Sequence, residues 1–147
     1  MTTAAHDDLL KSGILRVGIN LGNILLVNGE TANGVPEGVA PDMGRALADR
    51  LGIEVQYVNY AAPGAVADGA ERNEWDVGLI AFEPKRAQVI AFCDPYVEIE
   101  ATYLVPSHSL CQCIEDLDNP GVRIAVSERS AYDLYLSRTL KHATLFR

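Results

Sequence analysis

The stretch PDMGRALADRLGIEVQYV, residues 41–58, decides the fold because its hydrophobic period changes once, at a glycine. The apolar residues that share one helical face in its first half are Met43, Ala46, Leu47 and Leu51. Gly52 is typical of a helix end, and residues 53–59 after it alternate as a β-strand does. A helix that leads directly into a strand is the unit from which α/β folds are built.

Strands and helices alternate along most of the chain. Residues 14–19 (ILRVGI) predict a short strand, and the apolar run at residues 75–82 (WDVGLIAF) predicts one that is buried on both faces. This alternation indicates an α/β fold with a sheet that is mostly parallel. The other expected elements are a small hairpin that includes residues 25–27, a helix at 64–73, a short helix from 84 to 89, and a strand, helix and strand after 121.

The clearest two-residue period runs from residue 97 to residue 105 and predicts a strand. Residues 106–121, PSHSLCQCIEDLDNPG, have the composition of a connector with one helical turn. We therefore divide the chain into a first lobe at 1–105, a crossover at 106–121 and a partial second lobe at 122–147. The last part is too small to bury a core alone.

Composition excludes several classes of protein. The net charge of -8 argues against a nucleic-acid binder, which would carry a basic face. No segment is apolar enough to span a bilayer, and the first 13 residues have no signal-peptide pattern. We expect neither a metal nor a cofactor, because the three cysteines and three histidines form no cluster. These residues are Cys93, Cys111, Cys113, His6, His108 and His142.

Four segments, in this order, resemble the extracellular solute-binding protein family 3, the amino-acid-binding receptors of ABC importers. They are LRVGIN (15–20), PDMGRALADRLGIEVQYV (41–58), EWDVGLIAFEPKRAQVIAFCDPYVEIEATYLV (74–105) and GVRIAVSERSAYDLYLSRTL (121–140). The resemblance implies a periplasmic-binding-protein-like fold of type II. It has two α/β lobes joined by crossover strands, with the ligand in the cleft, and we expect the second lobe to be incomplete here.

The resemblance also implies a ligand site. The family's arginine at the position of Arg86 binds the α-carboxylate of an amino acid, and a planar guanidinium can bond both oxygens. Ala81 stands where many relatives carry a hydroxyl, so only its backbone is available, and Phe82 follows it. Glu83 has two open roles, to attract a ligand ammonium or to neutralise Arg86. On residue chemistry alone, Arg86 is equally compatible with a surface ion pair to Glu83 or Asp94.

Further candidates lie elsewhere in the chain. Ser130 begins the helix of the second lobe, where the family offers an anion site at the helix N-terminus, although capping is an equal alternative. Arg129 stands where relatives often have glycine, which puts that contact in doubt. The resemblance places Asn20 and Asn23 in the loop after the first strand, beside the cleft, as ligand-binding candidates, although asparagine is common in turns anyway. We interpret Asp42 as a helix-start residue and residues 94–96 (DPY) as structural.

Three functions compete. The leading one is a non-catalytic module that binds an amino acid or similar small carboxylate, with an ABC transporter permease as a partner. The second is a relic or interaction protein that keeps the fold without the ligand. The third is an enzyme similar to cyclohexadienyl dehydratase, with Glu83 as the one nameable acid or base. An incomplete lobe favours a homodimer that exchanges elements. The family implies a periplasmic protein, while the missing signal pattern leaves the cytoplasm open.

Overall fold

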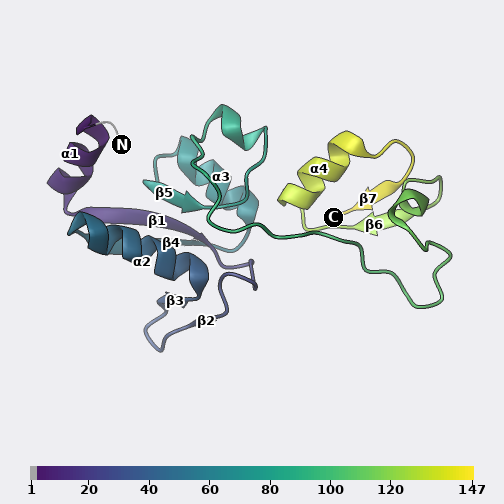
Figure 1. Cartoon of the computed structure of the whole chain (residues 1–147), viewed down its shortest axis with the longest axis horizontal. Coiled ribbons are helices and arrows are strands. Elements are labelled where there is room, and N and C mark those ends of the chain that lie inside the picture. Colours follow the sequence, from purple (N-terminus) through teal and green to yellow (C-terminus); the bar gives the residue numbers. More distant parts are fainter. Residues whose placement is uncertain (1–2) are drawn as a thin grey trace. The chain divides into compact units, whose positions relative to one another are not determined.

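The computed structural model describes residues 3–147, and the chain divides into two compact units, residues 1–90 and 91–147 (Figure 1). The division lies earlier than the boundary after residue 105 that the sequence pattern suggested. The alternating segment, residues 97–105, therefore groups with the second unit. Among the described residues, no helix is both long enough and apolar enough to cross a membrane.

The first unit is built on a parallel sheet of three strands in the order β4-β1-β5. This arrangement confirms the α/β class with a parallel sheet. Parallel strands need crossover connections, and the helices α2 and α3 provide them. The elements of the unit are α1 (Thr3–Ser12), β1 (Ile14–Asn20), β2 (Gly29–Glu30), β3 (Pro36–Glu37), α2 (Val39–Leu51), β4 (Glu54–Tyr60), α3 (Pro63–Glu71), β5 (Val77–Leu79) and the 3-10 turn η1 (Arg86–Gln88).

The core of the first unit lies on β1, the central strand. Leu15, Val17 and Ile19 are fully buried, because they belong to one cluster with the buried alanines of α2. Along the β1–β5 pair, the register joins Ile19 to Leu79. Since β5 is an edge strand, its three residues are only partly buried, and the prediction of burial on both faces was wrong for this strand.

Helix α2 packs on the sheet through its smallest residues. Ala40, Gly44 and Ala48 are buried, whereas Met43 and Ala46 of the predicted face are exposed. A Cβ atom on Gly44 would lie 2.8 Å from Cγ1 of Val17, so glycine is what allows this close approach. The helix was predicted correctly, and its predicted face was right in part, because Leu47 and Leu51 pack against the core while Met43 and Ala46 are exposed. It ends as predicted, with the C-cap at φ 69° in the left-handed region.

A small antiparallel hairpin precedes α2, but it is not where the sequence placed it. It pairs β2 with β3, and the apolar patch at residues 25–27 precedes it. In that patch, the N–H groups of Leu26 and Val27 both donate to the carbonyl of Asn23, at 3.0 and 2.8 Å. The patch is therefore a turn, in which Val27 is buried and Leu25 is 64% exposed.

The second unit contains a parallel pair, β6-β7, joined through a helix. This confirms the predicted strand, helix and strand. Its elements are the 3-10 turn η2 (Ile114–Leu117), β6 (Arg123–Ala125), α4 (Ala131–Thr139) and β7 (Thr144–Phe146). The core is small, with buried Leu117, Ile124 and Leu136 at its centre.

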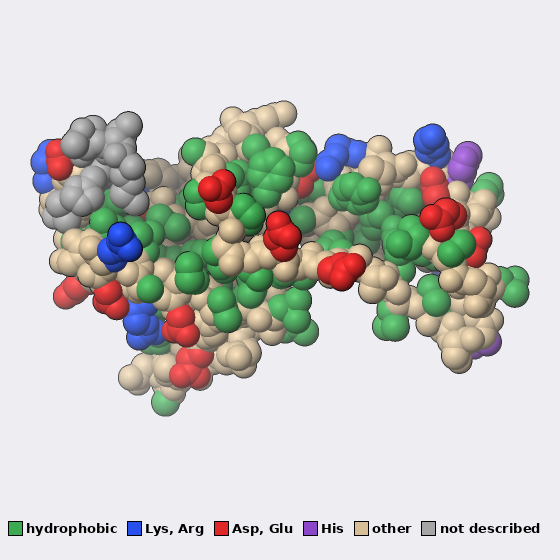
Figure 2. Space-filling model, in the orientation of Figure 1, with side chains coloured by type: hydrophobic (Ala, Val, Ile, Leu, Met, Phe, Trp, Pro, Cys, Tyr) green, Lys and Arg blue, Asp and Glu red, His purple; other side chains and the backbone are tan. Residues whose placement is uncertain are grey.

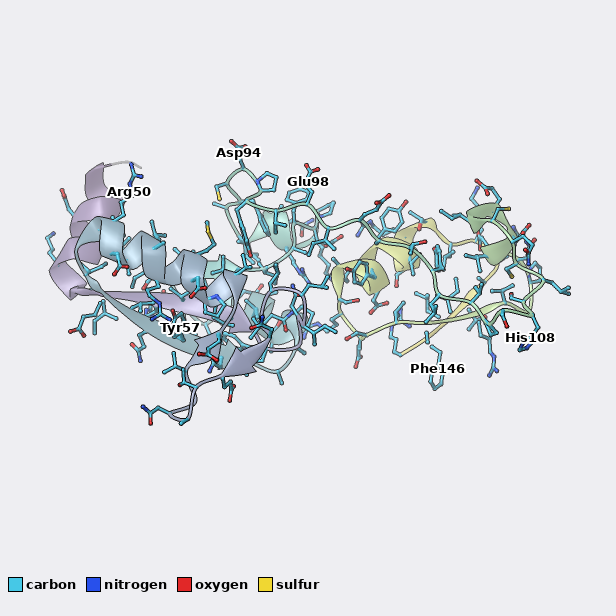
Figure 3. The ribbon with its side chains drawn as sticks, turned by 60° about the horizontal axis from the view of Figure 1, so that its bottom comes forward. Arg50, Tyr57, Asp94, Glu98, His108 and Phe146 are labelled. Carbon is cyan, nitrogen blue, oxygen red and sulfur yellow. The ribbon has the colours of Figure 1, made fainter. Side chains whose placement is uncertain are left out.

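Residues 97–105 form neither helix nor strand in the structure, so the predicted strand is not formed. Figure 3 shows Glu98 on this long connecting segment, which carries side chains but no regular element. The physical reason is that a strand exists only when a neighbour pairs with it. Alternation in the sequence indicates which residues suit a strand, but it does not supply the partner.

Candidate functional site

Five predicted site residues lie at the carboxyl edge of the first unit's sheet. Because Ile19 pairs with Leu79 in parallel strands, Asn20 and residues 80–83 leave that edge side by side. The turn η1 follows directly and brings Arg86. In open α/β sheets, ligands bind in the crevice outside the carboxyl ends of the strands. The topology therefore places Asn20, Ala81, Phe82, Glu83 and Arg86 where that rule expects a ligand.

Arg86 is buried within its loop, with 4% of the residue exposed. Its Nη1 donates a hydrogen bond to the carbonyl oxygen of Ala81 at 2.9 Å. This geometry differs from that of an arginine on the open surface. A backbone turn holds the same loop, because the N–H of Ala87 donates to the carbonyl of Glu83 at 3.0 Å.

Glu83 is buried even more deeply, at 2% exposure. Its Oε2 accepts the N–H of Lys85 at 2.8 Å. Two opposite charges, Glu83 and Arg86, are thus buried three residues apart in one short loop. A buried charge is costly unless another charge or hydrogen bonds compensate it. Both roles proposed for Glu83 remain compatible with this position.

Beside the buried charges, Phe82 is 65% exposed and Ala81 is also exposed. An exposed ring next to a buried cation is a surface on which a ligand can stack. Asn20 uses its side chain locally, since its Oδ1 accepts the N–H of Gly22 at 3.1 Å. Asn23 does the same with Leu25 at 3.3 Å. Both asparagines thus form turns at the end of β1.

In the second unit, Ser130 and Arg129 form the start of α4. Ser130 is the N-cap, and its Oγ accepts the N–H of Asp133 at 3.1 Å. The N–H of Arg129 donates to Oδ2 of Asp133 at 2.7 Å. The side chains of Ser130 and Asp133 thus each accept a backbone N–H at the start of α4, Ser130 from Asp133 and Asp133 from Arg129. Arg129 has φ 56°, a left-handed conformation that glycine adopts at low cost.

Asp133 is the central acceptor of this unit. Besides Arg129, it accepts Oγ of Ser137 at 3.1 Å and Nε of Arg147 at 3.0 Å. The hydrogen bond from Arg147 lowers the pKa of the Asp133 carboxyl, against the effect of burial. The carboxylate thus joins the helix start to the chain after β7, and this role was not foreseen from the sequence.

The remaining candidate residues give less support for a functional site. Asp42 is exposed in the first turn of α2, where a carboxylate interacts favourably with the helix dipole, but it does not cap the helix. Its Oδ1 lies 4.0 Å from Nη2 of Arg45. Cys93, Cys111 and Cys113 are free thiols. Within residues 3–147, no cluster of three or more His, Cys, Asp or Glu side chains could hold a metal. Acidic side chains are spread along the face in Figure 2, in keeping with the net charge of -8.

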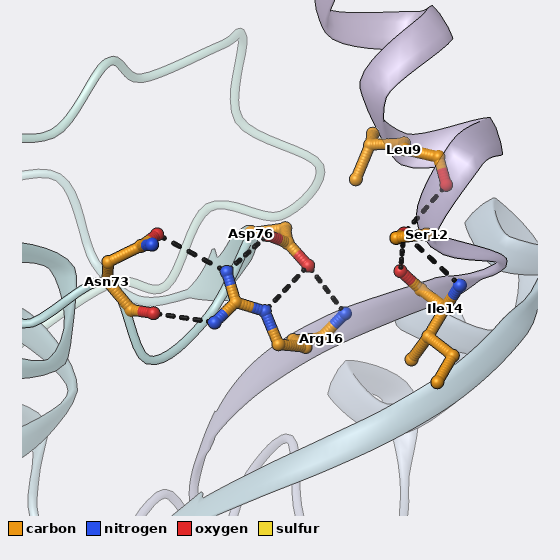
Figure 4. Close-up of polar contacts among 6 residues, drawn as sticks. All are labelled: Leu9, Ser12, Ile14, Arg16, Asn73 and Asp76. Atoms are coloured by element: carbon orange, nitrogen blue, oxygen red, sulfur yellow. Dashed lines mark hydrogen bonds and ion pairs between the residues drawn. The ribbon is translucent and has the colours of Figure 1, made fainter.

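A hollow of about 760 Å³ lies in the first unit at the opposite, amino edge of the sheet, and it was not foreseen. Figure 4 shows its central contacts: Nη2 of Arg16 lies 2.6 Å from Oδ1 of Asp76, and Nη1 lies 2.6 Å from the carbonyl of Asn73. Burial acts to raise the pKa of Asp76, but the bonds from Arg16 hold it below its usual value. The guanidinium of Arg16 is occupied by these protein acceptors. The contacts beside the hollow therefore join β1 to the start of β5. Its lining is Asp8, Leu9, Ser12, Ile14, Arg16, Gln56, Asn73, Trp75 and Asp76.

The α/β fold with its parallel sheet is that of the periplasmic binding proteins of type II. The family model of the bacterial extracellular solute-binding proteins, family 3, matches residues 15–131. The chain belongs to this family. Comparison with curated protein sequences gave no match.

Solved structures agree with this membership. An ancestral amino-acid-binding protein, described as a precursor of cyclohexadienyl dehydratase, has a TM-score of 0.78 and 26% identity, over 96% of this chain and 63% of that one. The cysteine-binding protein from Campylobacter jejuni has a TM-score of 0.70 and 20% identity, over 97% of this chain and 58% of that one. A mutant of the arginine-bound ArgBP from T. maritima has a TM-score of 0.68 and 21% identity, over 96% of this chain and 67% of that one. The chain spans less than two thirds of the length of the first two.

Proposed function

We propose that this chain binds the α-carboxylate of an amino acid, or a similar small carboxylate, at the carboxyl edge of the first unit's sheet, without chemical conversion. The observation that carries the proposal is the buried guanidinium of Arg86 beside Ala81. A cation held in a low-dielectric position interacts more strongly with an anion than one in water does. Solved relatives named for amino-acid, cysteine and arginine binding support the ligand class.

The other candidate residues, which belong to both units, have distinct roles in this proposal. Phe82 supplies an exposed ring for the ligand's apolar or cationic part. Glu83 holds the guanidinium in place or meets the ligand ammonium. Ser130 and Arg129 cap α4, and the Ser130 hydroxyl still has a proton to donate to an anion.

A panel of amino acids tests the proposal, with calorimetry and melting shifts as the readouts. We expect at least one member to raise the melting temperature, and Arg86→Ala to abolish that shift. Arg45→Ala is the matched control, because Arg45 is an exposed arginine of the same unit. A binding response that survives Arg86→Ala would contradict the proposed site. No response across a broad panel would favour a relic that keeps only the fold.

A dehydratase-like enzyme is the second candidate, and one observation favours it. A solved ancestral cyclohexadienyl dehydratase shares the fold, with a TM-score of 0.55 and 21% identity. Catalysis of an elimination needs a positioned acid or base, and Glu83 is the candidate at this edge. Turnover of prephenate or arogenate that Glu83→Gln abolishes would establish the enzyme. We expect none.

The proposal extends to partners and location. Membership in a family of extracellular solute-binding proteins supports a periplasmic receptor that delivers its ligand to an ABC transporter permease. We also propose a homodimer. The second unit has only a two-stranded sheet, which is marginal by itself, and Leu104 and Leu110 are 101% and 95% exposed. Light scattering on the purified protein measures the oligomeric state directly.

A further inference from the structure

Cys111 and Cys113 are separated by a single residue in the connector before η2, and both are free thiols. Cys111 is partly buried and packs against the small core of the second unit. Cys113 is exposed and is the N-cap residue of η2. One thiol is therefore held by the core, and the other is open to a reagent in solution.

The backbone bends between the two cysteines. The N–H groups of Gln112 and Cys113 both donate to Oδ2 of Asp116, at 2.8 and 3.2 Å. Successive N–H groups point to opposite sides of an extended chain, so they share one acceptor only where the chain turns, here at Gln112. A turn draws the Cα atoms on its two sides together, into the range of about 4.4–6.8 Å in which a disulfide forms.

The side chains of the two cysteines also turn toward the same residue. Sγ of Cys111 donates to the carbonyl oxygen of Asp116 at 3.8 Å, and the side chain of Cys113 accepts the N–H of Asp116 in a capping box. Both sulfur atoms thus lie against the backbone of one residue. A thiol is a weak donor and a weak acceptor, so the exchange of these contacts for a covalent bond loses little.

We propose that Cys111 and Cys113 form a reversible disulfide by exchange with a small organic disulfide. The thiolate of the exposed Cys113 attacks one sulfur of the donor, the S–S bond of the donor breaks, and one small thiol leaves. The thiolate of Cys111 then attacks Sγ of Cys113 and displaces the second small thiol. The protein loses two electrons and two protons, and the donor gains them.

The surroundings of Cys113 favour the disulfide at equilibrium. Hydrogen bonds with Glu115 and Asp116 raise the pKa of the Cys113 thiol above its usual value. Stabilisation of a thiolate makes a disulfide easier to reduce, so acidic neighbours, which disfavour the thiolate, make it harder to reduce. The family is extracellular, and disulfides persist outside the cell. A ring closed over one residue is strained, which keeps the exchange reversible.

An excess of oxidised glutathione, added to the intact chain with Cys93→Ser, tests the pair. We expect mass spectrometry to show the loss of two hydrogens and no bound glutathione, and dithiothreitol to restore both thiols. Cys111→Ser and Cys113→Ser in this background are the matched controls, because a single thiol can carry one glutathione but cannot close a ring. Thiols that stay free, glutathione on both cysteines, or a covalent dimer would overturn the proposal.

Urea separates the contribution of the fold from that of sequence spacing. The equilibrium constant of the pair against reduced and oxidised glutathione is measured for the folded chain and for the chain unfolded in urea. We expect it to be about 10-fold larger in the folded chain, because the bend positions the cysteines before they react. Asp116→Ala removes the shared acceptor and should bring the folded value toward the unfolded one. Equal constants in the folded and unfolded chain would overturn the role of the bend.

Discussion

The guanidinium of Arg86 lies 2.9 Å from the carbonyl oxygen of Ala81, five residues earlier in the chain. This contact closes a loop at the carboxyl edge of the sheet, in which the arginine is 4% exposed. Nη1 of the guanidinium is held by the protein in this arrangement. An arginine that is positioned by its own loop loses little conformational freedom when it binds a carboxylate.

The geometry of Arg86 makes charge alone insufficient for binding. We expect Arg86→Lys to weaken amino-acid binding about 10- to 100-fold, because an ammonium cannot form the planar fork that meets both carboxylate oxygens. Titration calorimetry of both proteins with the ligand found in the panel measures this. Affinity equal to that of the unsubstituted chain would contradict a bidentate role.

Gly44 should resist substitution although it lies inside a helix. Helix propensity predicts that Gly44→Ala stabilises the chain by about 1 kcal/mol. We expect the opposite, a loss of about 1–3 kcal/mol, because the added Cβ meets the buried Val17. Urea unfolding followed by Trp75 fluorescence measures the change. Ala46→Gly, at an exposed site of the same helix, should lose about 1 kcal/mol through propensity alone.

Asp118 should make the second unit sensitive to acid. Its carboxylate accepts the N–H groups of Lys141, His142 and Ala143, and these bonds lower its pKa from 3.8 to about 2. A carboxyl whose folded pKa is depressed contributes stability above its unfolded pKa and loses it as pH falls. We expect this contribution to be complete above about pH 4 and to disappear toward pH 2.

Hydrogen exchange of the amides in α4 and β7 against pH measures this acid sensitivity. Asp118→Asn should lower protection at neutral pH and flatten its dependence on pH between about 4 and 2. Asp42→Asn is the matched control, because Asp42 is exposed and belongs to the first unit. The same pH dependence in Asp118→Asn as in the unsubstituted chain would contradict the assignment.

We expect substitution of Ser130 to lower the stability of the second unit. Its hydroxyl caps α4, so Ser130→Ala should destabilise the second unit by about 1 kcal/mol, and Ser130→Gly by only a few tenths. Chemical unfolding followed by far-UV circular dichroism ranks the two. If the two variants bind the ligand as tightly as the unsubstituted chain, Ser130 is a cap alone. A loss of affinity in both would assign the hydroxyl to the ligand as well.

Much of the fold could be predicted because its signals are local. The helix at 39–51, its end at Gly52, and the strands at 14–20 and 54–60 all follow from periods within a few residues. The buried face of α2 could not be predicted in the same way. It depends on the contact of Gly44 with Val17, and hydrophobicity alone favoured Met43, which is exposed.

The candidate site, too, could be predicted from the sequence only in part. The resemblance to the family indicated Arg86, Ala81, Phe82 and Glu83, which lie close together in one motif. It did not indicate that Arg86 and Glu83 are both buried, nor that Asp133 accepts bonds from Arg129 and Arg147. Likewise, nothing local joins Arg16 to Asp76, which are 60 residues apart.

Local periodicity and the order of motifs thus determined the class of fold, the family and the loop that carries Arg86. The tertiary structure alone decided which residues of α2 face the sheet, how Asn20 comes to lie beside the end of β5, and that residues 97–105 have no pairing strand within the described chain. The physical reason is that helices and turns form from contacts between near neighbours. Sheets, buried charges and close packing depend on residues that only the folded chain brings together.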